Sequence, residues 1–370
     1  MDDFIQDILD EPGSLEAVRE AIGHVDTALV DLLNRRANLS LAAGRLKREG
    51  LVKGEIFQPG RELELIKSLE QQSAGPLPIE HLRAIYREIL SSSRYLQRPQ
   101  RVAFPGPEGS FSHMAARALL GSLASFHPQA DMEGVFQAVA NGDCDTGIVP
   151  LEQSRQDGLG AVIDLFIHHE LFIQAETFFQ VRHSLLAHEK DLASIDRVHT
   201  HPQPLAQCSE WLMKHLPKAS FVPMESAAAA AKHVAHSKKK GLAAIAHASL
   251  AGELNLHLLA GGIENDSGNR TRFVLVGRKE ADRPGTDKSS LLFSVTGDKG
   301  SLTRVLQCLS DRKIRLHKIE SRLMPGDVDT HVFFADLDCD IYDESHIGVI
   351  EAMAEHCLNL KVLGSYSSGS

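Results

Sequence analysis

Apolar residues recur at helical spacing through the first hundred residues. The longest stretch without a proline has its apolar positions at Ile22, Val25, Leu29, Leu32, Leu39 and Ala43. This pattern predicts a helix from about residue 15 to residue 47 with Ser14 as its N-cap, followed by helices over 61–72 and 80–97. The first helix would span about 50 Å. Because that exceeds the width of a small domain, we expect an intertwined dimer.

From residue 101 onward, short apolar runs alternate with helical stretches. The predicted strands are 101–104, 146–150, 197–200, 220–224, 242–246 and 272–277. The predicted helices between them are 112–120, 132–141, 203–215 and 226–236. This alternation predicts an α/β domain with mostly parallel strands.

Two polar segments, 98–100 and 278–288, are predicted to be linkers. After the second linker the predicted elements are strand 291–296, helix 301–312, strand 314–320, strand 331–337, helix 343–356 and strand 360–363. This βαββαβ order predicts a ferredoxin-like fold. We therefore expect a multidomain chain, all-helical, then α/β, then α+β, divided into 1–98, 101–280 and 288–366.

Composition limits the class of protein. The 370 residues are 43% hydrophobic and 24% charged, as expected for two or three globular domains. The formal net charge of -10 argues against a nucleic-acid partner. The five cysteines form no C-x-x-C pair and their odd number does not suit a disulfide framework, so we expect a reducing cytoplasm. Neither a signal peptide nor a membrane span is expected, and the 19 histidines show no metal-ligand spacing.

Charged and polar residues interrupt the apolar stripes of the three predicted helices. Arg36 continues the stripe of the first helix, and Lys47 projects from the same face three turns later. Ser93 and Gln97 continue the stripe of the third helix, and Glu62 lies on the inner face of the second. Any one of them could be a rim residue that reaches solvent. Taken together they predict a cationic pocket for a small dicarboxylate, because buried cations need an anion.

This set resembles the all-helical chorismate mutase family over residues 14–98. The matching residues are Arg19, Arg36, Lys47, Arg61, Glu62, Ser93 and Gln97, with Gln58 where the family usually has an acid. The resemblance implies rearrangement of chorismate to prephenate without a cofactor. It also implies that arginines hold the two carboxylates. Arg19 lies about 100° away from the stripe by helical geometry and could serve a site formed with the other subunit. Lys47 and Gln97 would donate to the ether oxygen as its negative charge grows.

In the middle segment, hydroxyl and polar residues gather at junctions between predicted strands and helices. The relevant strings are GPEGSFS (106–112), THPQ (200–203), ESAAA (225–229) and NRTRF (269–273). None is a nucleotide-binding fingerprint. Junctions of this kind line the ligand crevice of open α/β sheets. Each string alone also fits an ordinary capped helix or strand start.

Together these strings resemble prephenate dehydratase over about 101–280. The resemblance implies two α/β lobes with the site in the cleft between them. It also implies loss of carbon dioxide and water from prephenate, with Thr271 as donor to the departing hydroxyl. Further substrate contacts would come from Ser110, Ser112, Thr200, His201, Gln203, Ser226 and Arg272. Thr200 and Gln153 differ from the serine and asparagine that the family prefers.

Residues 289–366 resemble an ACT regulatory domain of the type attached to this dehydratase. The matching strings are GDKGSL (297–302) and ESRL (320–323), although Leu323 stands where the family has proline. The resemblance implies a phenylalanine site that includes Gly300, Ser301, Leu302, Glu320, Ser321 and Arg322. The alternative is a plain ferredoxin-like dimerisation module.

The combined expectation is a cytoplasmic bifunctional enzyme of phenylalanine biosynthesis, a homodimer or tetramer, inhibited by phenylalanine. It would use chorismate and prephenate and need no cofactor, metal, nucleic acid or membrane. Two alternatives remain open. The helical segment could be a degenerate dimerisation arm on a dehydratase, or the chain could be a non-catalytic sensor of aromatic acids or amino acids.

Overall fold

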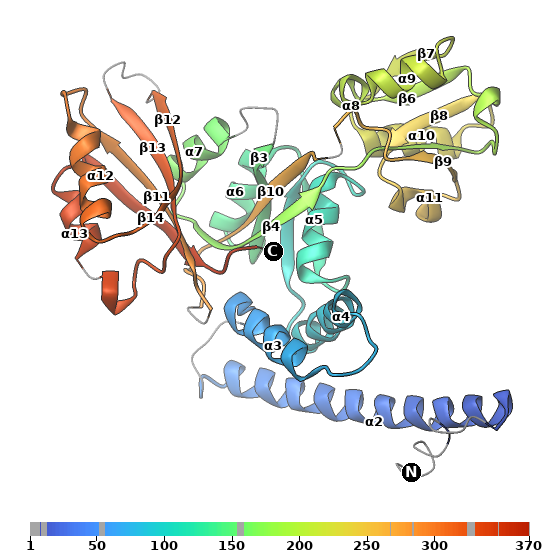
Figure 1. Cartoon of the computed structure of the whole chain (residues 1–370), viewed down its shortest axis with the longest axis horizontal. Helices are drawn as coiled ribbons and strands as arrows, with labels where there is room; N and C mark the ends of the chain where they lie inside the picture. The colour runs from blue at the N-terminus through green and yellow to red at the C-terminus, as the bar shows by residue number, and fades with distance from the viewer. Residues whose placement is uncertain are drawn as a thin grey trace.

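The computed structural model describes residues 8, 13–51, 56–153, 159–266, 268–282, 285–323, 330–346 and 348–369. Within that part of the chain it contains three β-sheets. Figure 1 shows a helical N-terminal part, two sheet-containing lobes and a C-terminal module that lies against the first lobe. No helix among the described residues is long and apolar enough to cross a membrane.

The N-terminal part consists of the three predicted helices, which are confirmed to within two residues at each end. They are α2 (Leu15–Arg48), α3 (Pro59–Gln72) and α4 (Ile79–Gln97). Ser14 caps α2 as predicted, since its hydroxyl accepts the N–H of Ala17 at 3.1 Å. Helix α4 contacts α2, α3 and α5, so it connects the helical part to the next domain (Figure 1).

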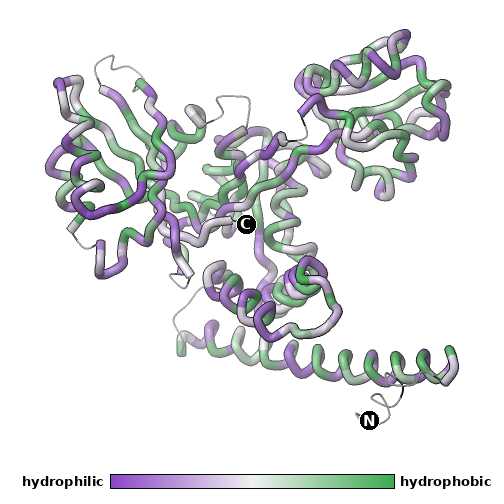
Figure 2. Tube along the Cα trace, in the orientation of Figure 1, coloured by the Kyte–Doolittle hydropathy of each residue, from purple (hydrophilic) through white to green (hydrophobic). Residues whose placement is uncertain are grey.

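Most of the apolar stripe of α2 is exposed in a single chain. Only Ala21 and Gly44 of this helix are buried. Leu15 is 62% exposed, Leu29 is 51% exposed and Leu32 is 61% exposed. Figure 2 shows hydrophobic positions along the whole length of this helix. Within the part of the chain that the structure describes, the long helix therefore presents an apolar face that no other element covers.

The first lobe holds a five-stranded sheet in the order β2-β1-β3-β10-β4. Its strands are β1 (Arg101–Pro105), β2 (Ser125–Gln129), β3 (Thr146–Gln153), β4 (Phe172–Gln180) and β10 (Arg270–Gly277). Its helices are α5 (Phe111–Leu120), α6 (Met132–Ala140) and α7 (Leu159–His168). The core between them is apolar and closed, with Val102, Phe104 and Ile148 fully buried.

The second lobe holds another five-stranded sheet, in the order β7-β6-β8-β5-β9. Its strands are β5 (Ser184–Ala187), β6 (Arg197–Thr200), β7 (Ser220–Pro223), β8 (Leu242–Ala246) and β9 (His257–Gly261). Its helical elements are η1 (Leu192–Ser194), α8 (Pro202–Gln207), α9 (Ser209–His215), α10 (Ala227–His236) and α11 (Ser249–Glu253). The predicted helix 203–215 is therefore divided in two at Cys208.

The expectation of mostly parallel strands holds for strand direction, since four of the five strands in each lobe run the same way and one, β10 or β5, runs against them. Strand β1 pairs parallel with β2 and β3, and β6 pairs parallel with β7 and β8. Strand β10 is antiparallel to β3 and β4, while β5 is antiparallel to β8 and β9. The chain crosses between the lobes from β4 to β5 and returns from β9 to β10. These crossings bring in strands that run against the parallel set, and β2, β4, β5 and β9 were not predicted from the sequence.

The C-terminal module has the predicted βαββαβ order and an antiparallel sheet in the order β12-β13-β11-β14. Its strands are β11 (Lys288–Val295), β12 (Leu316–Leu323), β13 (His331–Leu337) and β14 (Asn359–Tyr366). Its helices are α12 (Ser301–Asp311) and α13 (Val349–Ala354), with η2 (Glu344–His346) between the last two strands.

The C-terminal module packs directly on the first lobe. Phe334, Leu363 and Tyr366 belong to the same buried cluster as Phe136 and Val274 of the lobe. At Gly364 the backbones of β14 and β4 approach so closely that a Cβ would lie 2.3 Å from the carbonyl oxygen of Ile173. The two bodies therefore share one hydrophobic core.

Candidate active sites

A cavity of about 390 Å³ lies among α2, α3 and α4. Its polar lining includes seven of the residues predicted from the sequence. These are Arg36, Lys47, Gln58, Arg61, Glu62, Ser93 and Gln97. Apolar side chains such as Leu39 and Leu90 line the remainder. The three helices thus bring the predicted cations, acid and neutral donors together around one space.

Hydrogen bonds orient the polar side chains of this helical cavity. Arg36 donates from Nη1 to the hydroxyl of Ser93 and to the carbonyl oxygen of Ile89, the latter at 3.5 Å. Gln97 donates from Nε2 to the carbonyl oxygen of Ser93 at 3.2 Å. Lys47 is half-buried at the cavity wall. The cavity therefore presents a guanidinium and an ammonium group next to a fixed amide.

Arg94 is a cavity residue that the sequence interpretation missed. Its side chain is buried, forms an ion pair with Glu62 and donates to the carbonyl oxygen of Leu120. Burial raises the pKa of Glu62, although the charge of Arg94 opposes that effect. The available signal was its position four residues after the buried Leu90, on the same helical stripe.

Arg19 does not reach the helical cavity of its own chain. It is exposed and lies seventeen residues before Arg36, which is about 25 Å along α2. Its predicted role concerned a site formed with the other subunit, so a single chain leaves that prediction open.

The N-terminus of α3 is capped from a distant segment. Gln58 is the N-cap residue, but its side chain makes no capping hydrogen bond. Instead the carboxylate of Asp282 accepts the N–H groups of Gly60 at 3.0 Å and Arg61 at 2.9 Å. Asp282 belongs to the linker predicted over 278–288, so this linker holds the helix that carries Glu62.

A second cavity, of about 260 Å³, lies in the cleft between the two lobes. Six of the predicted residues line it. These are Ser110, Ser112, His201, Gln203, Ser226 and Thr271. Further polar lining comes from His183, Gln207, Glu225, His247 and Asn269.

Three helices begin at this cleft. The hydroxyl of Ser110 caps α5 by accepting the N–H of His113 at 3.3 Å, and the hydroxyl of Ser226 caps α10 by accepting that of Ala229 at 3.0 Å. His201 caps the short α8 through Nδ1. Helix N-termini carry partial positive charge, so this arrangement favours an anionic ligand.

Thr271 and Thr200 occupy different positions relative to the cleft. Thr271 lies on β10 and lines the cavity beside Asn269. Thr200 is buried, and its hydroxyl donates to the carbonyl oxygen of His201 at 3.2 Å. Since Thr200 is not among the lining residues, its predicted contact with substrate is not supported by this geometry.

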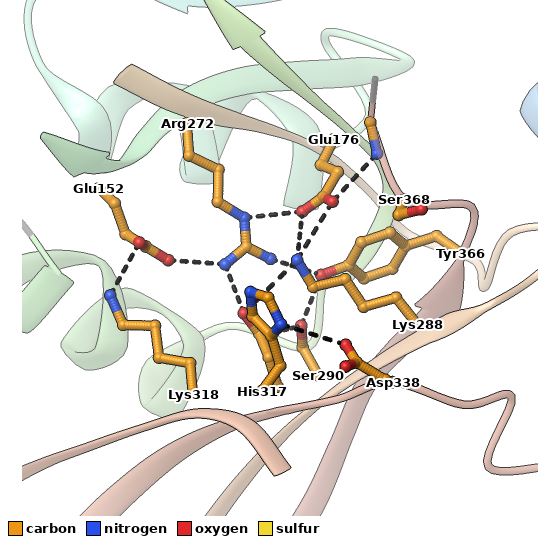
Figure 3. A network of polar contacts seen from close by, with 12 residues as sticks. Glu152, Glu176, Arg272, Lys288, Ser290, His317, Lys318, Asp338, Tyr366 and Ser368 are labelled. Carbon is orange, nitrogen blue, oxygen red and sulfur yellow. Dashed lines mark hydrogen bonds and ion pairs between the residues drawn. The ribbon is translucent and has the colours of Figure 1, made fainter. Parts of the chain in front are cut away.

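Arg272 faces away from the cleft, contrary to the carboxylate-binding role predicted for it. Successive residues of a strand point to opposite faces, so Arg272 and Thr271 cannot both face the cavity. The guanidinium is 3% exposed and is bonded to Glu152 at 2.6 Å and to Glu176 at 2.7 Å. It also donates to Asp336 and Tyr366 of the C-terminal module. Figure 3 shows Glu152, Glu176 and Tyr366 around the guanidinium.

Two histidines of the cleft were missed because the sequence gives no reason to separate them from the other seventeen. His183 is fully buried, and its Nε2 lies 2.7 Å from Oε1 of Gln207. Burial lowers the pKa of both His183 and His247. Phe111 makes edge contacts with both rings, at centroid distances of 5.5 and 6.2 Å. Part of the cleft lining is therefore aromatic, with two imidazoles whose charged form is disfavoured by burial.

The residues predicted for a phenylalanine site lie in two places on the C-terminal module, at the start of α12 and on β12. Their hydrogen-bond, ion-pair and packing partners differ from one residue to the next. Gly300 caps α12 in the left-handed conformation, and the hydroxyl of Ser301 donates to the carbonyl oxygen of Thr296 at 2.8 Å. Leu302 packs against the core of the module. On β12, Glu320 pairs with Lys318, Ser321 is exposed, and Arg322 pairs with Asp164 of α7 at 2.8 Å.

Within the described residues, no group of three or more His, Cys, Asp or Glu side chains is arranged to hold a metal ion. The five cysteines are free thiols. Burial raises the pKa of the Cys208 thiol, which packs in the core of the second lobe, to about 12. A thiolate nucleophile is not available at such a position.

Two family models match the chain. The model described as chorismate mutase type II matches residues 18–98, and the model described as prephenate dehydratase matches residues 102–281. Relatives named bifunctional chorismate mutase/prephenate dehydratase align over nearly the whole chain. The relative from Stutzerimonas stutzeri is 34% identical over 97% of this chain and 99% of its own. The relative from Escherichia coli K12 is 28% identical over 96% of each chain.

Solved structures also resemble the chain. A prephenate dehydratase from Arthrobacter aurescens in complex with L-Phe is 29% identical, with a TM-score of 0.65 over 72% of this chain and 90% of that one. A structure named as a quorum-quenching acylase, GqqA, is 25% identical, with a TM-score of 0.66 over 73% of this chain and 98% of that one. A prephenate dehydratase from Staphylococcus aureus, at 22% identity and a TM-score of 0.64, shares the fold.

Proposed function

The chain belongs to the family of bifunctional chorismate mutase/prephenate dehydratases, and we propose that it performs both reactions at two separate sites. The helical cavity would rearrange chorismate to prephenate. The cleft between the lobes would convert prephenate to phenylpyruvate. The observation that carries the proposal is that each cavity gathers most of the residues expected for its reaction, from different elements of the chain.

At the helical cavity, Arg36 and Arg61 would bind the carboxylates of chorismate. Both arginines line the cavity with Lys47 and Gln97. A guanidinium matches a carboxylate in forked geometry. Binding would select the compact conformer of the substrate, and Lys47 and Gln97 would donate to the ether oxygen as its bond breaks. The buried Arg94–Glu62 pair would hold Glu62 towards the substrate hydroxyl.

This reaction needs no nucleophile. A millionfold acceleration corresponds to about 8 kcal/mol. A donor placed at the developing charge contributes roughly 3–4 kcal/mol. Two donors together with conformer selection therefore reach the required range.

At the cleft, Thr271 would donate a hydrogen bond to the ring hydroxyl of prephenate as it leaves with its bonding electrons. Loss of carbon dioxide supplies the electron pair that makes the ring aromatic, and the departing hydroxide takes a proton from solvent to become water. The capped starts of α5 and α10 would bind the carboxylates. Gln203 and His201 would contribute further contacts.

The C-terminal module would act as an ACT regulatory domain that binds phenylalanine and lowers dehydratase activity. Support comes from its βαββαβ plan and from the L-Phe complex of the similar dehydratase. We place the effector near Gly300–Leu302 and Glu320–Arg322, at an interface with a second module. The exposed apolar face of α2 supports a homodimer, in which Arg19 would complete the partner's helical cavity.

A coupled assay tests the proposal. Purified chain incubated with chorismate should form prephenate and then phenylpyruvate, and added phenylalanine should lower the second rate. Phenylpyruvate from prephenate but not from chorismate would leave the helical part as a dimerisation arm. Binding of either acid without turnover would make the chain a sensor.

A further inference from the structure

A buried cation lies next to Thr271 on the same strand. Thr271 lines the cleft, while the adjacent Arg272 points to the opposite face of β10 and into the junction with the C-terminal module. Figure 3 shows the guanidinium at the centre of a network of polar contacts. One residue of this strand therefore belongs to the cleft and the next belongs to the interface between two domains.

The guanidinium bonds to strands on both sides of β10 and to the module. Glu152 lies on β3 and Glu176 on β4, the two strands that flank β10. Asp336 lies on β13 and Tyr366 on β14. The planar group has five N–H donors in fixed directions, so it constrains the relative positions of all four partners.

A second buried cation closes the network. Lys288 of β11 lies 3.0 Å from one carboxylate oxygen of Glu176 and 3.1 Å from the other. Ser290 donates to Asp336 at 2.5 Å, and its oxygen lies 2.6 Å from that of Tyr366. Glu176, Lys288, Asp336 and Tyr366 are each 5% exposed or less. Because separating buried charges is costly, the module cannot slide against β10 without a large penalty.

Arg272 also sits at an irregularity of its own strand. The pairing of β10 with β3 is regular up to Arg272 opposite Glu152, and it shifts register before Phe273, which pairs with Pro150. Such shifts bend a strand and redirect its side chains. The bond between Arg272 and Glu152 spans the last pair before the shift, one residue from Thr271.

We propose that Arg272 is a positioning residue for dehydration, which holds Thr271 at the cleft and makes its placement depend on Asp336 and Tyr366 of the C-terminal module. This inference rests on the function proposed for the cleft. It concerns the chain without any effector bound, so the module contributes to catalysis as well as to any regulation.

Tyr366→Phe is the most direct test, because it removes the hydroxyl that bonds Arg272 and Ser290 and leaves all buried charges paired. It should lower the dehydratase kcat by roughly 3- to 10-fold, with an unchanged KM for prephenate and unchanged mutase activity. The matched control is Ser289→Ala, which removes an equally buried hydroxyl of the same sheet that bonds to Cys339 and Ser365 instead. An equal loss of kcat in both variants would overturn the proposal, since it would reduce the effect to general stability.

A second readout does not depend on turnover. The ¹³C-labelled methyl resonance of Thr271 should shift in Tyr366→Phe and remain in place in Ser289→Ala. An unshifted Thr271 methyl in Tyr366→Phe would refute the link between the module and Thr271. Absence of dehydratase activity in the unchanged chain would instead refute the proposed function, while the methyl resonance would still test the link.

Discussion

Gly44 of α2 packs directly against Gln97 of α4. A Cβ at position 44 would lie 3.1 Å from both the Cα and the Cγ of Gln97. This close approach brings α2 near enough to α4 for Arg36 to bond Ser93 across the cavity. Glycine lowers the stability of a helix interior, but at position 44 its small size allows α2 and α4, which carry the cavity residues, to come into contact.

Gly44→Val should widen this helix crossing and impair the mutase site. The added atoms would push Gln97 away, and a misplacement of about 1 Å can reduce a rate by roughly 100-fold. We expect mutase kcat/KM to fall at least tenfold, measured as chorismate consumption. Dehydratase activity on prephenate is the internal control, because its cleft lies on other elements. Unchanged mutase activity would show that Gln97 tolerates displacement.

Lys47→Ala should remove most mutase activity and leave dehydratase activity intact. Loss of one donor to a developing negative charge lowers kcat by about 100- to 1,000-fold. Arg45→Ala is the matched control, since Arg45 is an exposed cation on the same turn that does not line the cavity. Equal effects of the two substitutions would point to long-range electrostatics instead of a specific donor.

The helical site was largely predictable because its signals are local. Arg36 and Lys47 interrupt an apolar stripe, and a stripe can be followed along one helix. The relation of Arg94 to Glu62 depends on how α3 packs against α4, which no single helix reveals. Asp282 lies 222 residues from the backbone group that it caps, so its role follows only from the tertiary fold.

The middle domain was harder to predict. Strand β4 pairs with β10, almost a hundred residues later, and its sequence FIQAETFFQ does not alternate cleanly between apolar and polar residues. Arg272 was predicted at the cleft because it is adjacent to Thr271. Strand alternation places it on the other face, where Glu152 and Glu176 of the flanking strands and Asp336 of the C-terminal module pair with the buried guanidinium.

Thr271→Ala should have the reverse effect of Lys47→Ala. Losing the hydroxyl should lower the dehydratase kcat by about 100-fold or more, since one hydrogen-bond donor at a developing negative charge contributes about 10²–10³-fold. Mutase activity should remain. Thr271→Ser keeps the hydroxyl and should retain most of the rate, measured as phenylpyruvate formation. Near-normal dehydration by Thr271→Ala would remove Thr271 from its assigned role.

The cleft histidines should make folding stability dependent on pH. Burial lowers the pKa of His183 in the folded chain, so the unfolded chain takes up the proton first as the pH falls below about 6.5. The contribution of His183 to the free energy of unfolding is therefore fully present above that pH. It decreases below that pH, by at most about 1.4 kcal/mol per pH unit.

Denaturant unfolding at pH 7.5 and pH 5.5 measures this dependence. His183→Gln should lower stability at pH 7.5, because it disturbs the contact with Gln207, yet it should reduce the difference between the two pH values. His236→Gln, at an exposed position, should leave the difference as it is. An unaltered difference in His183→Gln would assign the acid sensitivity to other groups.

The cap on α3 makes mutase activity depend on the linker before the C-terminal module. Asp282→Ala removes the acceptor of the N–H groups of Gly60 and Arg61, a loss of about 1 kcal/mol in helix stability. Fraying at this end would displace Gln58, Arg61 and Glu62 from the cavity. We therefore expect a higher KM for chorismate, several-fold above that of the unchanged chain, with dehydratase kinetics unaltered.

The matched control for this cap is Asp131→Ala, which removes the N-cap of α6 in the first lobe. It should reduce stability by a similar amount and leave the KM for chorismate in place. If both substitutions raise that KM equally, the effect belongs to overall stability. If only Asp282→Ala raises the KM for chorismate, then a residue outside the helical part influences substrate affinity at the helical cavity. The structural reason is that the carboxylate of Asp282 caps α3, whose own N-cap residue Gln58 makes no capping hydrogen bond.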